Sequence, residues 1–69
     1  MNKNALITIK KIKINSASSN KKLAELLGLS STSISYWMNG RRGPSIENIL
    51  KLEKLSKQYK VPFNREDFF

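Results

Sequence analysis

The sequence predicts an all-α fold, a compact bundle of four to five helices in a single domain that spans residues 1–69. Three observations support this fold class. Apolar residues recur at helical spacing along most of the chain. Residues 20–39 show this spacing on both sides of a glycine, as expected for two short helices joined by a tight turn. A chain of 69 residues is also too short for more than one hydrophobic core.

Residues 1–14 predict a first helix, although they also contain a strand signal. Leu6, Ile9 and Ile12 repeat every three residues, and two further isoleucines add a second row. The segment is rich in isoleucine and alternates with lysine at its end, which is also typical of a strand. A polar linker follows over residues 15–19, and its last residue is a serine suited to cap the next helix.

The segment around Gly28 predicts a tight turn between two short helices. Glycine enters the left-handed conformation of such a turn without steric cost. Ala24 is small enough to permit a close crossing of the two helix axes. Leu29 and Ile34 flank Ser30 at the spacing of a hydrophobic staple, so Ser30 is the expected N-cap of the second helix.

The second helix of this pair, Ser31–Met38, combines an apolar side with short polar side chains. Trp37 is expected in the core. The polar residues of the helix are Ser31, Thr32, Ser33, Ser35 and Tyr36. Such hydrogen-bonding side chains suit base edges and phosphate oxygens in the major groove of DNA. Tyr36 is expected either to touch a base or a thymine methyl group, or to cover the edge of the core.

These residues resemble the helix-turn-helix of the Cro and repressor family. The resemblance rests on Ala24, Gly28, Ile34 and Trp37 at the family spacing, followed by Met-Asn-Gly-Arg-Arg over residues 38–42. The run from Ser19 to Phe69 is similar to short Cro-like regulators of the YdaS type, found in phages and plasmids. The resemblance implies a lambda-repressor-like domain with its helix-turn-helix at about residues 20–39. It also favours a helix over a strand for residues 1–14.

The resemblance implies a double-stranded DNA partner, read through the helix Ser31–Met38. The expected base contacts are Ser31, Thr32, Ser35 and Tyr36. The expected phosphate contacts are Asn20, Lys21, Lys22, Ser33, Asn39, Arg41 and Arg42. Lysines in the first turn of a helix oppose its dipole unless an anion lies nearby, which favours a phosphate clamp at residues 20–22. A solvated basic turn is the alternative.

The C-terminal third predicts one more helix and a short capped turn. Ser45 and Pro44 mark the start of the helix, and Pro62 prevents its continuation. Its expected apolar face comprises Ile46, Ile49, Leu50, Leu52, Leu55 and Tyr59. Residues 64–67 predict a final capped turn. Phe63 is expected to point inward, and Phe68 or Phe69 to lie at a dimer contact.

The net charge of +8 is unevenly distributed along the chain. Residues 1–42 hold eight basic side chains and one acidic one, which gives +7, whereas residues 43–69 hold five basic and four acidic ones, which gives +1. A basic surface around a helix-turn-helix favours a polyanionic partner.

Composition excludes several function classes. The chain has no cysteine and no histidine, so we expect no disulfide, no metal site, no cofactor and no catalytic residue. No apolar run is long enough to span a bilayer, and the lysines within residues 1–14 argue against a signal peptide. We therefore expect a soluble cytoplasmic protein, active at the nucleoid of a bacterial or phage-infected cell.

The sequence predicts a Cro-like transcriptional repressor that binds a palindromic operator as a homodimer. Two alternatives remain at this point. One is the DNA-binding antitoxin of a toxin–antitoxin pair, which would also bind a toxin protein; the short C-terminus argues against it. The other is a protein-interaction module that keeps the fold without binding DNA, and the charge around the motif argues against that.

Overall fold

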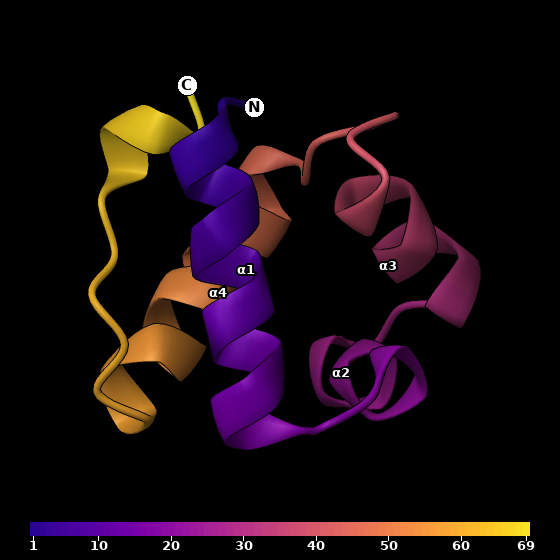
Figure 1. Cartoon of the computed structure of the whole chain (residues 1–69). Helices are drawn as coiled ribbons and strands as arrows, with labels where there is room; N and C mark the ends of the chain where they lie inside the picture. Colours follow the sequence, from indigo (N-terminus) through magenta and orange to yellow (C-terminus); the bar gives the residue numbers. More distant parts are fainter.

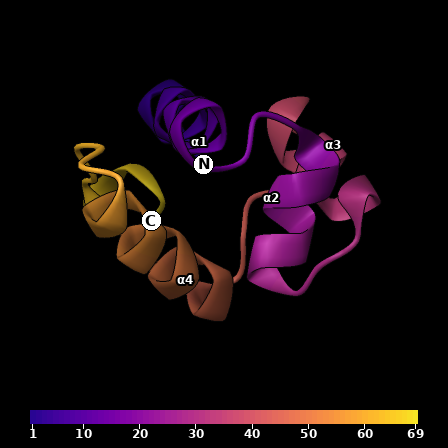
Figure 2. The ribbon, with the colours of Figure 1, turned by 90° about the horizontal axis from the view of Figure 1, so that it is seen from below.

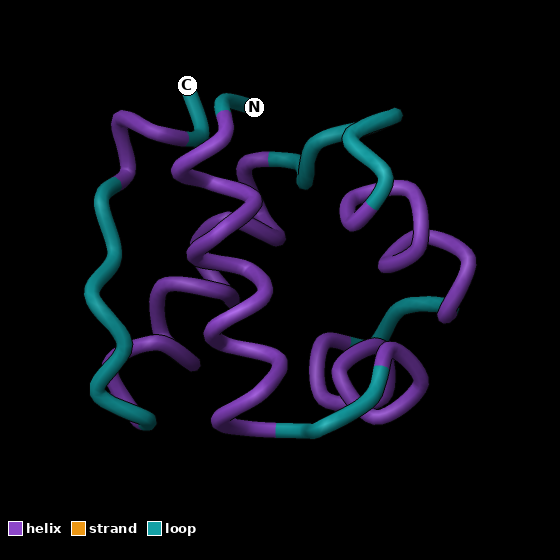
Figure 3. The backbone as a smooth tube through the Cα atoms, viewed as in Figure 1, coloured by secondary structure: helices purple, strands orange, loops and turns teal.

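The computed structural model describes all residues, 1–69, and contains four α-helices, a final 3₁₀ turn and no strand (Figures 1 and 3). The elements are α1 (Lys3–Ser16), α2 (Asn20–Leu27), α3 (Ser31–Met38), α4 (Ile46–Gln58) and η1 (Arg65–Asp67). The predicted all-α bundle is confirmed.

The N-terminal segment is a helix, so the alternative of a strand is wrong. α1 begins and ends two residues later than predicted. It begins at Lys3 because the side chain of Asn2 caps it by accepting a hydrogen bond from the backbone N–H of Ala5 at 2.9 Å. Ile9 and Ile12 are fully buried, as their spacing predicts. The second row of isoleucines was expected to add to the apolar pattern, but Ile7 and Ile14 remain 49% and 70% exposed.

The two helices around Gly28 form as the sequence predicts. Gly28 takes the left-handed conformation at φ 71° and ψ 33°, and ends α2. The N–H of Leu29 donates to the carbonyl oxygen of Ala24 at 2.8 Å, which closes the turn. Ser19 and Ser30 are the N-caps of α2 and α3, and each side chain accepts a backbone hydrogen bond three residues ahead. The predicted bounds of α3 are confirmed.

The core lies between α1, α2, α3 and α4, which pack around one apolar cluster. Ala24 is 2% exposed and Trp37 is 3% exposed, so both take the core positions predicted for them. The fully or largely buried apolar residues are Ala5, Ile9, Ile12, Ala17, Leu23, Ala24, Leu27, Ile34, Trp37, Ile49, Leu52, Val61 and Phe68.

The broad apolar face predicted for α4 is only partly buried. Ile49 and Leu52 lie in the core, whereas Ile46 and Leu50 are 66% and 48% exposed. The bundle covers one side of α4 only, so the apolar residues that continue around the helix remain in solvent. The helix also ends before Pro62 can stop it, because Lys60 takes a positive φ of 57° directly after the last turn.

The chain folds back after α4 and closes over the end of the bundle. Asn64 caps η1, as predicted, and the rings of Phe63 and Phe68 stack with centroids 4.8 Å apart. Phe68 is 8% exposed, so its side chain belongs to the core of its own chain. We therefore do not retain Phe68 as a dimer contact, whereas Phe69, which is 74% exposed, stays a prediction.

An ion pair that the sequence did not predict ties η1 to α4. The Glu53 carboxylate accepts two hydrogen bonds from the Arg65 guanidinium, at 2.9 and 2.7 Å. These hydrogen bonds lower the pKa of Glu53 below its ordinary value of 4.5. On α4, Glu47 and Lys51 form only a loose pair, with 3.9 Å between the carboxylate oxygen and the Lys51 Nζ atom.

This ion pair predicts a stability that depends on pH. A carboxyl group whose pKa is lower in the folded than in the unfolded chain stabilises the fold above its unfolded pKa, and the stabilisation is lost as pH falls through the folded pKa. We expect Glu53→Gln to lower the Tm near pH 7, and the difference in Tm from the wild type to shrink towards about pH 3. Thermal unfolding followed by circular dichroism measures both. Glu47→Gln is the matched control, and a difference for Glu53→Gln that stays constant across this range would contradict the assignment.

Candidate nucleic-acid interface

The free side of α3 carries the predicted base contacts. Ser31 and Thr32 are exposed, and Ser35 and Tyr36 are half-buried on the same side. These four residues alternate with the buried Ile34 and Trp37 at helical spacing, so they face away from the core. Figure 1 shows α3 at one edge of the bundle, with no other element beyond its outer side.

Ser33 takes part in the cap of its own helix. Its backbone N–H donates to the Ser30 hydroxyl oxygen at 3.3 Å, and the two hydroxyl oxygens also lie 3.3 Å apart. The hydroxyl group of Ser33 is therefore partly committed before any ligand arrives. Ser33, the predicted phosphate contact on α3, therefore also has a structural role in the cap of its helix.

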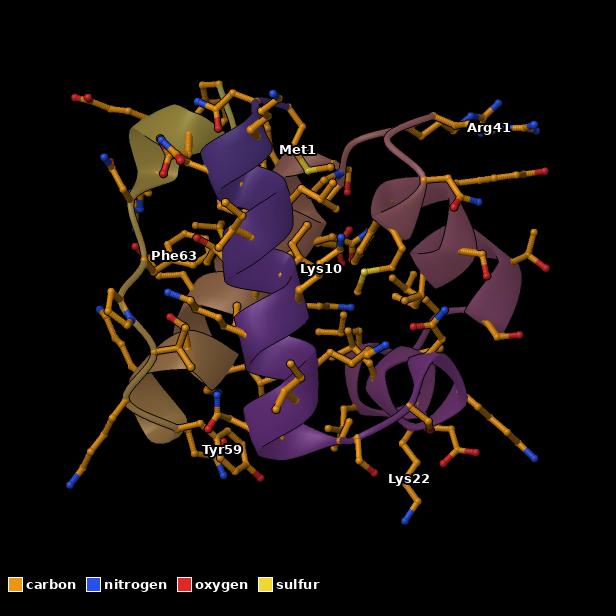
Figure 4. The ribbon with its side chains drawn as sticks, viewed as in Figure 1. Met1, Lys10, Lys22, Arg41, Tyr59 and Phe63 are labelled. Atoms are coloured by element: carbon orange, nitrogen blue, oxygen red, sulfur yellow. The ribbon has the colours of Figure 1, made fainter.

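The first turn of α2 presents two free lysines beside an unusual asparagine. Lys21 and Lys22 are exposed, and Figure 4 shows the Lys22 side chain extending away from the bundle. The backbone N–H of Lys22 already donates to the Ser19 hydroxyl at 3.1 Å. The Oδ1 atom of Asn20 is buried and has no hydrogen-bond partner, which is a cost that native proteins rarely leave unbalanced.

The loop after α3 holds two arginines against the end of that helix. Gly40 takes a left-handed conformation at φ 72°, as predicted. The N–H groups of Arg41 and Arg42 then both lie within hydrogen-bond distance of the carbonyl oxygen of Tyr36, at 2.9 and 3.4 Å. Both side chains and that of Asn39 are exposed, and Arg41 points out into solvent (Figure 4).

Tyr36 has a contact that neither sequence alternative included. The Arg42 guanidinium lies 5.8 Å from the centroid of its ring, which is within the range of a cation–π interaction. The pair links the exposed side of α3 to the loop that follows. Tyr36 and Arg42 are six residues apart, which is not the spacing of neighbours on a helix, so the sequence contains no signal for this contact. The contact depends on how the loop turns at Gly40.

A small cavity of about 180 Å³ beside Arg42 adds residues that the sequence did not single out. It lies between α3 and the start of α4, and its lining includes Ser33, Tyr36, Ser45 and Asn48. Ser45 was predicted only as a helix cap, and Asn48 was not predicted at all. Ser45 and Asn48 lie in the turn after Gly43-Pro44, and this position was the available sequence signal for a polar site. Side chains in a first helical turn lie beside backbone N–H groups that have no partner within the helix.

Two basic groups, Lys21 with Lys22 and Arg41 with Arg42, flank α3 and do not contact each other. Figure 4 shows the Lys22 side chain below α2 and the Arg41 side chain beyond the C-terminal end of α3, so α3 lies between the two side chains. Such a spacing suits an extended polyanion better than a small anion. No group of acidic or metal-ligating side chains in the chain could hold a metal ion. None of the helices has the length and apolar character that crossing a bilayer requires.

Comparison with protein families identifies the motif. The helix-turn-helix family model HTH_3 matches residues 9–63. The chain belongs to this helix-turn-helix family. The match begins within α1 and extends through α4 to Phe63, so it covers most of the chain and includes the α2–turn–α3 unit. No curated protein and no solved structure gave a significant match.

Membership of the HTH_3 family gives the chain a function at a coarse level. The family is one of DNA-binding domains and not of enzymes, and its members act in transcriptional regulation. DNA is therefore the partner of this helix-turn-helix domain. The individual base and phosphate contacts named above stay predictions.

Proposed function

We propose that this helix-turn-helix protein is a sequence-specific, Cro-like transcriptional repressor. The observation that carries the proposal is the free side of α3, where short uncharged hydrogen-bonding side chains lie between two basic groups. A helix of this kind enters the major groove with its N-terminal residues towards the base edges. Repression follows when the bound protein occupies a promoter. We place this activity in the cytoplasm, at the DNA of a bacterial or phage-infected cell.

Base recognition is assigned to Ser31, Thr32, Ser35 and Tyr36. Hydroxyl groups both donate and accept hydrogen bonds, and the methyl group of Thr32 can contact the thymine methyl group. Tyr36 is half-buried at one edge of the reading surface, and the Arg42 guanidinium lies 5.8 Å from the centroid of its ring. Residues this short read bases only when the helix lies deep in the groove.

Phosphate binding is assigned to the basic groups on either side of α3. Lys21 and Lys22, with Asn20 and the first backbone N–H groups of α2, form one clamp. Arg41 and Arg42, with Asn39, form the other, and their exposed charges suit charge-assisted hydrogen bonds to phosphate oxygens. Ser33 would join the second clamp by its remaining hydrogen-bonding capacity. These contacts fix the position of the helix without reading sequence.

We further propose that two copies bind a palindromic operator. One recognition helix reads only a few base pairs, so a dimer with half-sites about 34 Å apart is the usual way to reach a specific site. The sequence predicted Phe69 as a dimer contact, and its 74% exposed side chain leaves the C-terminus as the alternative to the α4 interface proposed below.

A reporter assay in cells tests the proposed activity. A promoter that carries the preferred duplex should lose expression when the wild-type chain is produced, and should keep it when the duplex is scrambled. Expression that rises would make the protein an activator. Expression that stays unchanged, in cells where the protein is folded and the duplex is bound, would contradict repression.

Arg42→Ala tests the phosphate clamp after α3. Removing one phosphate contact should weaken binding to all duplexes to a similar extent, and should reduce the slope of log K against log salt by about one unit. Titrations at several salt concentrations measure the slope. Lys3→Ala removes an exposed charge from the start of α1 and serves as the control. A slope that Arg42→Ala leaves unchanged would remove Arg42 from the phosphate contacts.

A further inference from the structure

The outer side of α4 carries apolar residues that the bundle does not cover. Ile46 and Leu50 lie one helical turn apart, and the buried face of the helix, with Ile49 and Leu52, points the other way. Figure 2 shows α4 at the edge of the bundle, with α1 and η1 on its inner side. Met1 is 43% exposed and lies against Gly43, just before this helix. A Cβ atom added at Gly43 would lie 3.3 Å from the Cβ atom of Met1.

Two opposite charges flank Leu50 on the same outer side. Glu47 lies three residues before Leu50, and Lys54 lies four residues after it. The Glu47 side chain is 81% exposed and is held only by the loose pair with Lys51. Lys54 is exposed and forms no ion pair within the chain. The outer side of α4 therefore places an acidic residue before Leu50 and a basic residue after it, and Lys51, which pairs with Glu47, lies between them.

We propose that this side of α4 binds the same side of a second copy, with the two α4 helices antiparallel about a two-fold axis near Leu50. An isologous interface requires a surface that is complementary to itself, so that each residue and its counterpart exchange contacts. In this arrangement Leu50 of each copy packs near the axis, and Glu47 of each copy meets Lys54 of the other. The proposal rests on the dimer in the proposed function and supplies its interface.

The charge distribution favours a second copy at this face over one elsewhere. Residues 1–42 carry +7 and would repel the same region of another copy, whereas residues 43–69 carry only +1. The outer side of α4 and the free side of α3 also point in different directions (Figures 1 and 2). A copy bound at α4 thus leaves both recognition helices open.

The same geometry predicts a weak dimer. A stable interface usually involves about 20–30 residues on each side, and one face of a 13-residue helix offers fewer. We expect the dimer to form mainly on an operator, where two half-sites hold the copies together and raise their effective concentration.

A charge-exchange experiment tests this interface. Glu47→Lys and Lys54→Glu should each reduce dimer formation by about tenfold or more, because each places like charges together twice across the axis. The double variant Glu47→Lys/Lys54→Glu exchanges the two charges and leaves the net charge unchanged, so it should restore dimer formation to within about threefold of the wild type. Sedimentation equilibrium measures dimer formation without DNA, and cooperativity on a palindromic duplex measures it with DNA.

Three further variants complete the design. Leu50→Ser should weaken the dimer without unfolding the chain, since its side chain is 48% exposed. Ile14→Ser changes an exposed isoleucine on α1 and should leave dimer formation unchanged. Phe69→Ala distinguishes the α4 interface from one formed by the C-terminus, and it should also leave dimer formation unchanged.

Several outcomes would overturn the interface. These are a wild-type chain that stays monomeric in both assays, single variants that dimerise normally, a double variant as weak as the singles, or a dimer that only Phe69→Ala abolishes. Binding to a half-site by the monomer should be equal in the wild type and the double variant. If the wild-type monomer did not bind a half-site, that result would count against the proposed function. Sedimentation without DNA would still test the α4 interface on its own.

Discussion

Trp37→Ala is expected to leave the fold only marginally stable at ambient temperature. Trp37 is 3% exposed and lies in the core on the inner side of α3. Replacing a buried tryptophan by alanine costs about 3–5 kcal/mol, from lost transfer free energy and the cavity left behind. A domain of 69 residues buries only about 60% of the surface that its unfolded chain exposes, which is less than larger domains bury, so we expect its stability to lie near the low end of about 5–15 kcal/mol. The substitution therefore removes most of the free energy of unfolding.

Far-UV circular dichroism with urea measures this effect, because the variant lacks the only tryptophan and has no tryptophan fluorescence. Thr32→Ala is the matched control on the same helix, since Thr32 is exposed on the opposite side. We expect its urea midpoint to stay close to that of the wild type. A Trp37→Ala chain that unfolds at the same urea concentration as this control would show that Trp37 does not support the core as described.

Thr32→Ala and Ser35→Ala are expected to reduce the preference for the cognate duplex. Each should lower discrimination between cognate and random DNA by about 1 kcal/mol or more, because a lost base-edge contact affects only the cognate complex. Helicity should change little, since neither side chain belongs to the core. Fluorescence anisotropy titrations with both duplexes measure the difference. Asn15→Ala, an exposed change at the end of α1, controls for substitution itself. Equal losses on both duplexes would remove the two residues from base reading.

Local chemistry made the helix-turn-helix predictable from sequence. Gly28 is needed where the backbone turns left-handed, and Ser19 and Ser30 cap the helices on either side. Each of these signals acts within a few residues, so it does not depend on the rest of the fold. The candidate site followed from the same segment, because the alternation of Ile34 and Trp37 with polar residues fixes which side of α3 is free.

Contacts between distant residues could not be predicted in this way. The Glu53–Arg65 ion pair and the stacking of Phe63 on Phe68 depend on how the chain turns back after α4. Periodicity gave the apolar side of α4 but not the fraction of it that the bundle covers, so the exposure of Leu50 was missed. The Arg42–Tyr36 contact likewise depends on the course of one loop.

A binding selection from a random duplex library tests the central claim most directly. The selected duplex is then titrated against a scrambled one at two salt concentrations. A sequence-specific dimer predicts an enriched palindrome with half-sites about one helical turn apart, whose advantage over the scrambled duplex persists at the higher salt. Enrichment of no sequence, with binding to all duplexes that collapses as salt rises, would contradict specific recognition and leave only an electrostatic attraction between a basic surface and DNA.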